Sequence, residues 1–265
     1  VKRVLNKYLL GDNLRVMVVG KGQDILTSLE EMPYDIMYFD KNGEPTTKPD
    51  FSTPTGITVE TVLNKYIEAI GGKEKVESVN AVSMLAEAEV QGMKLQMVSI
   101  QAKPNKMVQM MMMMGNTMMK MVFDGEKGAV SQQGMSSPLP ESEIQELINS
   151  TLPFEELGWL NDSNVKFSSV DEEDGKTLHV LEVSKNSFVA YDAETGLKFK
   201  QTEMGEMPDG SKIPQSTYFD DYREINGVLF PYLVKTPIGP QSLDFNVVNI
   251  SVNPQVSDSD FIIEE

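Results

Sequence analysis

The sequence contains no cysteine and a single histidine, His179. Without cysteine there is no disulfide, no thiol nucleophile and no cysteine-ligated zinc. A histidine-based zinc site needs about three or four protein ligands, and a Ser-His-Asp triad needs a positioned imidazole. His179 lies in an alternating segment, on the side opposite Leu178 and Val180, which predicts an ordinary solvent-facing or edge strand residue. We therefore expect no catalytic residue and no metal ligand in this chain.

Basic residues and long apolar runs are also scarce. Forty acidic residues against 23 lysines and arginines give a net charge of −17, and such a field repels nucleic acid and anionic lipid surfaces. Nucleic acid is therefore not an expected partner. No run of eighteen apolar residues occurs, so no membrane span is predicted. The start at Val1 lacks an initiator methionine and a signal-peptide core, and we interpret the chain as processed or cut.

Residues 1–45 have the pattern of a small αβ unit. Helical spacing runs over residues 1–9, an apolar strand is predicted at 14–19, a second helix at 25–32 and a second strand at 35–39. Strands this apolar are normally buried on both faces of a sheet. A unit this short has too few other elements to bury both faces. We interpret it as the truncated end of a larger αβ domain. Residues 46–57, rich in proline, glycine, threonine and serine, are predicted to be a linker.

The pattern of residues 58–265 predicts one helix followed by an antiparallel meander. The helix begins near Thr58 and ends at Gly71, with an apolar stripe of Val59, Val62, Leu63, Tyr66, Ile67 and Ile70. From Val79 onward, short runs are separated by turn signals such as those at 91–92, 174–175 and 226–227, a spacing typical of hairpins. Residues 140–150 and 152–160 predict one or two helices inserted between the halves of the sheet.

Methionine is concentrated in one part of this meander. Thirteen of the 18 methionines lie between Met84 and Met135. If residues 115–116 form a two-residue turn, alternation assigns two sets of methionines to opposite faces of the hairpin. The first set is Met110, Met112, Met114, Met119 and Met121, and the second is Met111, Met113 and Met118.

Methionine is flexible and polarizable, and it suits apolar surfaces that adapt to varied partners. The first set is therefore our candidate ligand-binding face, with Trp159 placed where an inserted helix could close the mouth of the cavity. One alternative is that these methionines only fill a solid barrel interior against helix 58–70. Copper(I) binding through thioethers is another, although the usual spaced motifs with supporting histidine are absent.

Three further motifs have ordinary explanations. Residues 171–175 lack the alternating ligands of a calcium loop and are predicted to be a solvated hairpin tip. The acidic residues Asp220, Asp221 and Glu224 have no second cluster to complete an acid–base pair and are assigned to a strand end. The turn at residues 20–22 lacks the remaining glycine and lysine of a phosphate-binding loop.

Two stretches resemble a known family. Residues 6–9, 13–20 and 38–43 resemble the final stretch of insulinase-like zinc peptidases, the pitrilysin group, over about residues 1–45. Residues 62–74, which read VLNKYIEAIGGKE, are similar to the start of the extra domain that such peptidases carry in Bacteroidetes-type bacteria. That domain resembles the periplasmic lipoprotein-carrier (LolA-like) fold. The inverted His-x-x-Glu-His motif of the peptidases is absent here, so no zinc ligand or catalytic glutamate is carried over.

The resemblance implies an α+β fold: a small αβ remnant, then a strongly curved antiparallel sheet, or half-barrel, wrapped over helices at residues 58–265. It implies a periplasmic or cell-envelope location and zinc only in the missing upstream part of a parent peptidase. Expected partners are the upstream peptidase domains and an acyl chain, a lipoprotein or an apolar peptide. Two other functions stay open, a stand-alone lipid or lipoprotein carrier and a purely structural module that shields or positions a protease.

Overall fold

The computed structural model describes residues 15–20, 22–40, 43–49, 56–132, 134–149, 153–206, 212–238 and 241–262. The chain divides into two compact units, residues 1–52 and 53–265. Each is described by itself.

The first unit contains one helix and one pair of short strands. Helix α2 spans Gly22–Glu30, and strand β1 (Tyr38–Phe39) pairs antiparallel with β2 (Pro45–Thr46). Lys48 bonds to Glu30 at 2.6 Å and so ties the strand pair to the helix. The predicted second helix is confirmed, shifted by a few residues, and the predicted second strand is reduced to its last two residues. The predicted helix at residues 1–9 lies outside the described residues.

The predicted strand at 14–19 is wrong for the residues that are described. Residues 15–19 have no regular structure, and Met17 and Val19 are exposed. An apolar run becomes a strand only where a neighbouring strand accepts its backbone hydrogen bonds. Among the described residues of this unit, only β1 and β2 pair.

The second unit begins with the predicted helix. Helix α3 spans Val59–Ala69; the hydroxyl of Thr58 accepts a hydrogen bond from the Thr61 amide, and the Thr61 hydroxyl accepts one from the Thr58 amide. This reciprocal cap satisfies two amides that the first turn leaves without partners. Gly71 and Gly72, both with positive φ, end the helix, and α4 (Lys73–Ser78) follows. The predicted start and end of the helix are therefore confirmed.

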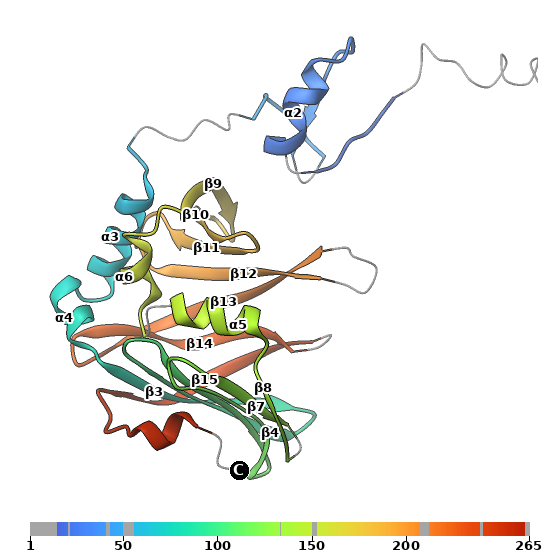
Figure 1. Cartoon of the computed structure of the whole chain (residues 1–265). Coiled ribbons are helices and arrows are strands. Elements are labelled where there is room, and N and C mark those ends of the chain that lie inside the picture. The colour runs from blue at the N-terminus through green and yellow to red at the C-terminus, as the bar shows by residue number, and fades with distance from the viewer. Residues whose placement is uncertain are drawn as a thin grey trace, which may run out of the picture. The chain divides into compact units, whose positions relative to one another are not determined.

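Thirteen strands then form one open antiparallel sheet (Figure 1). Their bounds are β3 Ala81–Val90, β4 Met93–Ala102, β5 Lys106–Met113, β6 Asn116–Phe123, β7 Gly128–Gln132, β8 Met135–Pro138, β9 Lys166–Glu173, β10 Lys176–Ser184, β11 Ser187–Asp192, β12 Lys198–Glu206, β13 Lys212–Ile225, β14 Val228–Ile238 and β15 Gln241–Val252. The order is β8-β7-β6-β5-β4-β3-β15-β14-β13-β12-β11-β10-β9. Every neighbour follows in sequence except at β15, which pairs with β3 and joins the two meanders.

Helices α5 (Glu141–Asn149) and α6 (Glu155–Trp159) lie between β8 and β9 in sequence, as predicted, and a short 3-10 helix, η2 (Asp258–Phe261), follows β15. The predicted α+β half-barrel is confirmed, because the sheet is curved and does not close on itself.

One side of the sheet, which we call the helix face, packs against α3. Buried α3 residues Leu63, Tyr66 and Ile67 form one hydrophobic cluster with sheet residues from both meanders, including Ala86, Leu95, Leu181, Tyr191 and Phe245. Burying this continuous surface is the main driving force for folding. The helices α3, α4 and α6 lie together along one side of the sheet in Figure 1.

The opposite side, which we call the far face, is also partly covered. Val108 and Val122 form a small cluster with Phe261 of η2. Leu178, Val180 and Ala190 form a second cluster, with Phe188 and Phe199 packed against it. Successive side chains of each strand therefore point alternately to the helix face and to the far face.

Candidate functional site

A buried ion pair lies between α6 and the helix face. The side chain of Glu156 is 3% exposed, and its Oε1 lies 2.5 Å from Nζ of Lys198, which is 14% exposed. The same oxygen accepts a hydrogen bond from the Tyr191 hydroxyl at 3.2 Å. Removing a charged group from water costs free energy, which the opposite charge of its partner offsets. Loss of either partner would therefore leave the other charge buried and unpaired. The pair ties α6 to β12.

Three aromatic rings surround the ammonium of Lys198. Its Nζ lies 5.6 Å from the ring centroid of Tyr66, 5.8 Å from that of Trp159 and 5.7 Å from that of Phe219. These rings come from α3, α6 and β13, three elements far apart in sequence. Ring faces attract cations within about 6 Å, so the lysine holds the helices and the sheet together at one point.

Burial raises the pKa of Tyr66 and of Tyr191 well above the ordinary value, and the nearby carboxylate of Glu156 raises both further. Both phenols therefore stay protonated at all physiological pH values. Tyr191 can then only donate to Glu156, which fixes the direction of that hydrogen bond.

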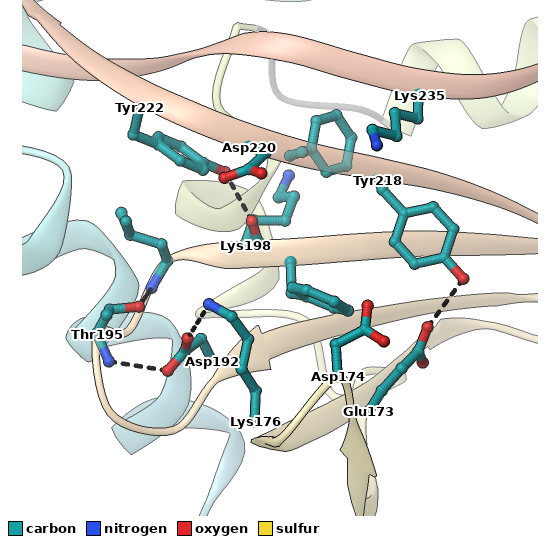
Figure 2. A pocket seen from close by; sticks show the side chains of 13 residues that line it. Glu173, Asp174, Lys176, Asp192, Thr195, Lys198, Tyr218, Asp220, Tyr222 and Lys235 are labelled. Carbon is teal, nitrogen blue, oxygen red and sulfur yellow. Dashed lines mark hydrogen bonds and ion pairs between the residues drawn. The ribbon is translucent and has the colours of Figure 1, made fainter. Parts of the chain in front are cut away.

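A cleft of about 490 Å³ opens where β12 and β13 separate (Figure 2). The ladder between these strands stops at the pair Lys200 and Tyr218. Beyond that point the Tyr222 hydroxyl donates to the backbone carbonyl of Lys198 at 2.8 Å and replaces a strand-to-strand bond. The lining residues are Glu173, Asp174, Lys176, Asp192, Thr195, Leu197, Lys198, Phe199, Tyr218, Phe219, Asp220, Tyr222 and Lys235.

Most polar groups of this cleft bond to one another. Lys176 contacts Asp192 at 2.8 Å, and the other carboxylate oxygen of Asp192 accepts from the amides of Glu194 and Thr195. Glu173 accepts from Tyr218 at 2.9 Å and pairs with Lys200. These contacts hold the β9–β13 strands in register. The cleft brings Asp220 of the predicted acidic cluster into its lining. The predicted strand end is confirmed for Glu224, the next-to-last residue of β13, but is wrong for Asp220 and Asp221, which lie further inside the strand.

The methionine hairpin is the second candidate site, and its predicted turn is wrong. Met114 and Gly115, with φ of 51° and 80°, occupy the two turn positions, and Met113 pairs with Asn116. This is the geometry of the tight hairpin turn that fits strand twist, with positive φ at both central residues. The register also shifts between Met111 and Met112, which leaves Met118 without a cross-strand partner.

The structure does not bring the six predicted site residues together on one face. Met111 pairs with Met119, and Met113 pairs with Leu95 of the core, so Met111, Met113 and Met119 lie on the helix face. Met121 shares that side by alternation. Met110 and Met112 lie on the far face, where the Thr117 hydroxyl contacts the sulfur of Met110 at 3.6 Å. Met114 is at the turn, and Trp159 packs against the core cluster.

No methionine among the described residues is fully buried. Met84, Met97, Met111 and Met113 pack against the edge of the core cluster while staying partly exposed. The core itself is built from leucine, isoleucine, valine and aromatic residues. A solid interior filled by methionine therefore does not describe this part of the sheet.

His179 lies on β10, the second strand from the edge, and so it is not on an edge strand. It pairs with Tyr191, points away from Leu178 and Val180 as predicted, and is half-buried near the ring of Phe167. Burial lowers its pKa below the ordinary value, and the positive charge of Lys65 lowers it further. The imidazole is therefore neutral in the folded protein near neutral pH.

This lowered pKa predicts a pH effect. Because the unfolded chain binds a proton at His179 before the folded protein does, the stability contributed by the neutral ring is lost as pH falls through the unfolded value of about 6.5. We expect His179→Gln to lose less stability than the wild type between pH 7.5 and 5.5. Urea unfolding at both pH values measures the difference, and equal losses in the two proteins would contradict the assignment.

Two further findings concern the described part of the chain. It contains no group of three or more His, Asp or Glu side chains placed to hold a metal ion. None of its helices is long and apolar enough to cross a membrane.

Comparisons with known proteins identify the fold. No family model and no curated protein matches the chain. Among solved structures, the chain is similar to a LolA superfamily protein from Nitrosomonas europaea, with a TM-score of 0.51 and 11% identity over 78% of this chain and 99% of that one. The sheet unit has the LolA-like fold. A DUF1329 family protein from Desulfovibrio piger is also similar, with a TM-score of 0.47 and 9% identity over 77% of this chain and 97% of the other.

Sequence reasoning missed the buried ion pair. Its only signal is an acidic residue, Glu156, inside the apolar segment 152–160. The partner Lys198 lies 42 residues later, in a segment whose other lysines are more exposed or pair elsewhere. Nothing in the sequence selects this lysine over its neighbours.

Proposed function

We propose that residues 58–265 bind an apolar ligand, such as an acyl chain or an apolar peptide, along the methionines of the helix face. The proposed surface is Met97, Met111, Met113, Met119 and Met121. Trp159 of α6 packs against the same core cluster as Met97, Met111 and Met113. The observation that carries the proposal is that Met97, Met111 and Met113 pack against the core cluster and yet remain partly exposed. Met119 and Met121, also partly exposed, lie on the same face of the neighbouring strand. An apolar strip that continues a closed core is suited to a ligand of the same polarity.

The residue type supports a ligand of variable shape. Methionine has three rotatable bonds and no branching, so it can adjust to acyl chains of different length. The likeness of the fold to the LolA superfamily supports an apolar ligand and a periplasmic or cell-envelope location. Met110 and Met112 are not part of this proposed surface, because they lie on the far face.

The larger context is also a proposal. The resemblance of residues 1–45 to insulinase-like peptidases supports a parent protein with upstream, zinc-containing catalytic domains, in which this unit holds a ligand or docks a protein. A stand-alone carrier of lipids or lipoproteins is the alternative. Sequencing the coding frame upstream of Val1 separates the two, since only the first requires an inverted His-x-x-Glu-His motif.

A pair of matched variants tests the ligand surface. Met111→Gln/Met113→Gln should weaken the binding of the fluorescent fatty acid cis-parinaric acid by about tenfold or more, because two apolar contacts of the ligand are replaced by amides. Met110→Gln/Met112→Gln makes the same chemical change one residue away, on the far face, and should leave the dissociation constant unchanged. Fluorescence titration measures both.

Equal weakening in the two variants would show that the effect does not depend on the face, and would overturn the proposed surface. Native mass spectrometry of freshly purified protein gives an independent result: a mass above that of the bare chain indicates a carried ligand. If wild-type protein neither carries a ligand nor binds the fatty acid, the structural-module alternative is favoured.

A further inference from the structure

Exposed methionines gather at one end of the β3–β8 meander. Successive hairpins of an antiparallel sheet turn at alternate ends, so the β3–β4, β5–β6 and β7–β8 turns all lie at the same end. These turns carry Met93 (37% exposed), Met114 (76%), Met118 (42%) and Met135 (75%). We call these four residues the methionine rim.

The hairpins stand side by side in the order of the sheet. Adjacent strands lie about 4.8 Å apart, which places neighbouring hairpin tips about 10 Å apart. The rim is therefore a row of separate apolar points rather than one continuous patch. Core packing does not explain it, because none of its members belongs to a hydrophobic cluster of the described residues.

The rim is free of charge. Residues 91–93, 114–118 and 132–135 contain no lysine, arginine, aspartate or glutamate. The whole chain carries a net charge of −17, with 24% charged residues. Beside Met93 the ladder pairs Glu89 with Lys94, one charge of each sign. An end with so little net charge is the part of an acidic protein that meets the least electrostatic repulsion from an anionic surface.

We propose that the methionine rim inserts its side chains into the surface of a lipid bilayer. A fluid bilayer accepts separate apolar points about 10 Å apart, whereas a protein partner would need a matching row of holes. Methionine is flexible enough to enter the boundary between headgroups and acyl chains, where apolar side chains bind. The contact is peripheral and reversible, since only four side chains enter.

Vesicle flotation tests the proposal on the full chain. Wild-type protein should float with vesicles of phosphatidylethanolamine and phosphatidylglycerol, and added salt should not release it, because salt screens the repulsion between two acidic partners. The variant in which Met93, Met114, Met118 and Met135 are all changed to glutamine should bind at least about tenfold more weakly. Val170→Thr/Val248→Thr/Ile262→Thr, which changes exposed apolar residues elsewhere in the unit, should bind like the wild type.

Methionine oxidation gives a residue-level result. With hydrogen peroxide present, vesicles should protect Met114 and Met135 from conversion to the sulfoxide, while Met17 and Met37 of the first unit, equally exposed, should oxidise at the same rate with and without vesicles. Protection that appears without vesicles and grows with protein concentration would assign the rim to self-association and overturn the proposal. So would wild-type protein that does not float, or a quadruple variant that floats equally well.

Discussion

Replacing Lys198 by alanine should destabilise the second unit by about 3–5 kcal/mol, because the Glu156 carboxylate is then left buried without its counter-charge. The lost contacts with the rings of Tyr66, Trp159 and Phe219 add to this cost. Urea unfolding followed by the fluorescence of Trp159, the single tryptophan, measures the change.

A double variant separates the charge from the packing. Lys198→Met/Glu156→Gln removes both charges, keeps similar volume and leaves an amide oxygen to accept the hydrogen bond from the buried Tyr191 hydroxyl, so its stability should lie near that of the wild type or above it. If the double variant is as destabilised as Lys198→Ala although its volume is kept, the loss comes from the missing pair itself. The expectation that an unpaired buried charge causes the loss would then be wrong.

Replacing Gly71 by alanine should destabilise the unit by roughly 2–6 kcal/mol, the sum of backbone strain and overpacking. Gly71 has a φ of 137°, and an added Cβ would lie 2.2 Å from the carbonyl oxygen of Gly227. The end of α3 docks there on the β13–β14 turn, where the Leu229 amide donates to the carbonyl of Ile70 at 2.8 Å. The helix could therefore keep its place only by breaking that contact.

Gly175→Ala is the matched control. Gly175 also has positive φ, at 75°, but it lies at a hairpin tip with nothing within 4 Å of an added Cβ. It should cost only about 1 kcal/mol, the strain of the backbone alone. Thermal unfolding of both variants tests the difference, and equal losses would show that the close approach to Gly227 has no energetic consequence.

The sequence predicted α3, its start near Thr58, its end at Gly71 and the meander because each depends on local signals. The stripe of α3 repeats at helical spacing, and the turns at 91–92, 174–175 and 226–227 each end in a glycine with positive φ. The strand predicted at 14–19 was wrong because an apolar run says nothing about whether a neighbour is available to pair with it.

The methionine faces could not be predicted because they depend on one irregularity. The error in the turn alone moves every cross-strand pair by two residues and leaves the faces unchanged. The bulge at Met118 moves the pairing back by one residue, which transfers Met119 and Met121 to the side of Met111. A bulge of this kind depends on the pairing of β6 with β5 and β7, which no local pattern shows.

The place of β15 between β3 and β14 has a consequence for synthesis on the ribosome. The strands β3–β8 and β9–β14 each pair only with near neighbours in sequence, so each meander can form as it emerges. The two can join only when residues 241–252 have been made, because β15 supplies the shared edge. Until then β3 is an open edge beside a methionine-rich surface, a condition that invites pairing with other chains. We therefore expect chaperone dependence to be concentrated in this interval of translation.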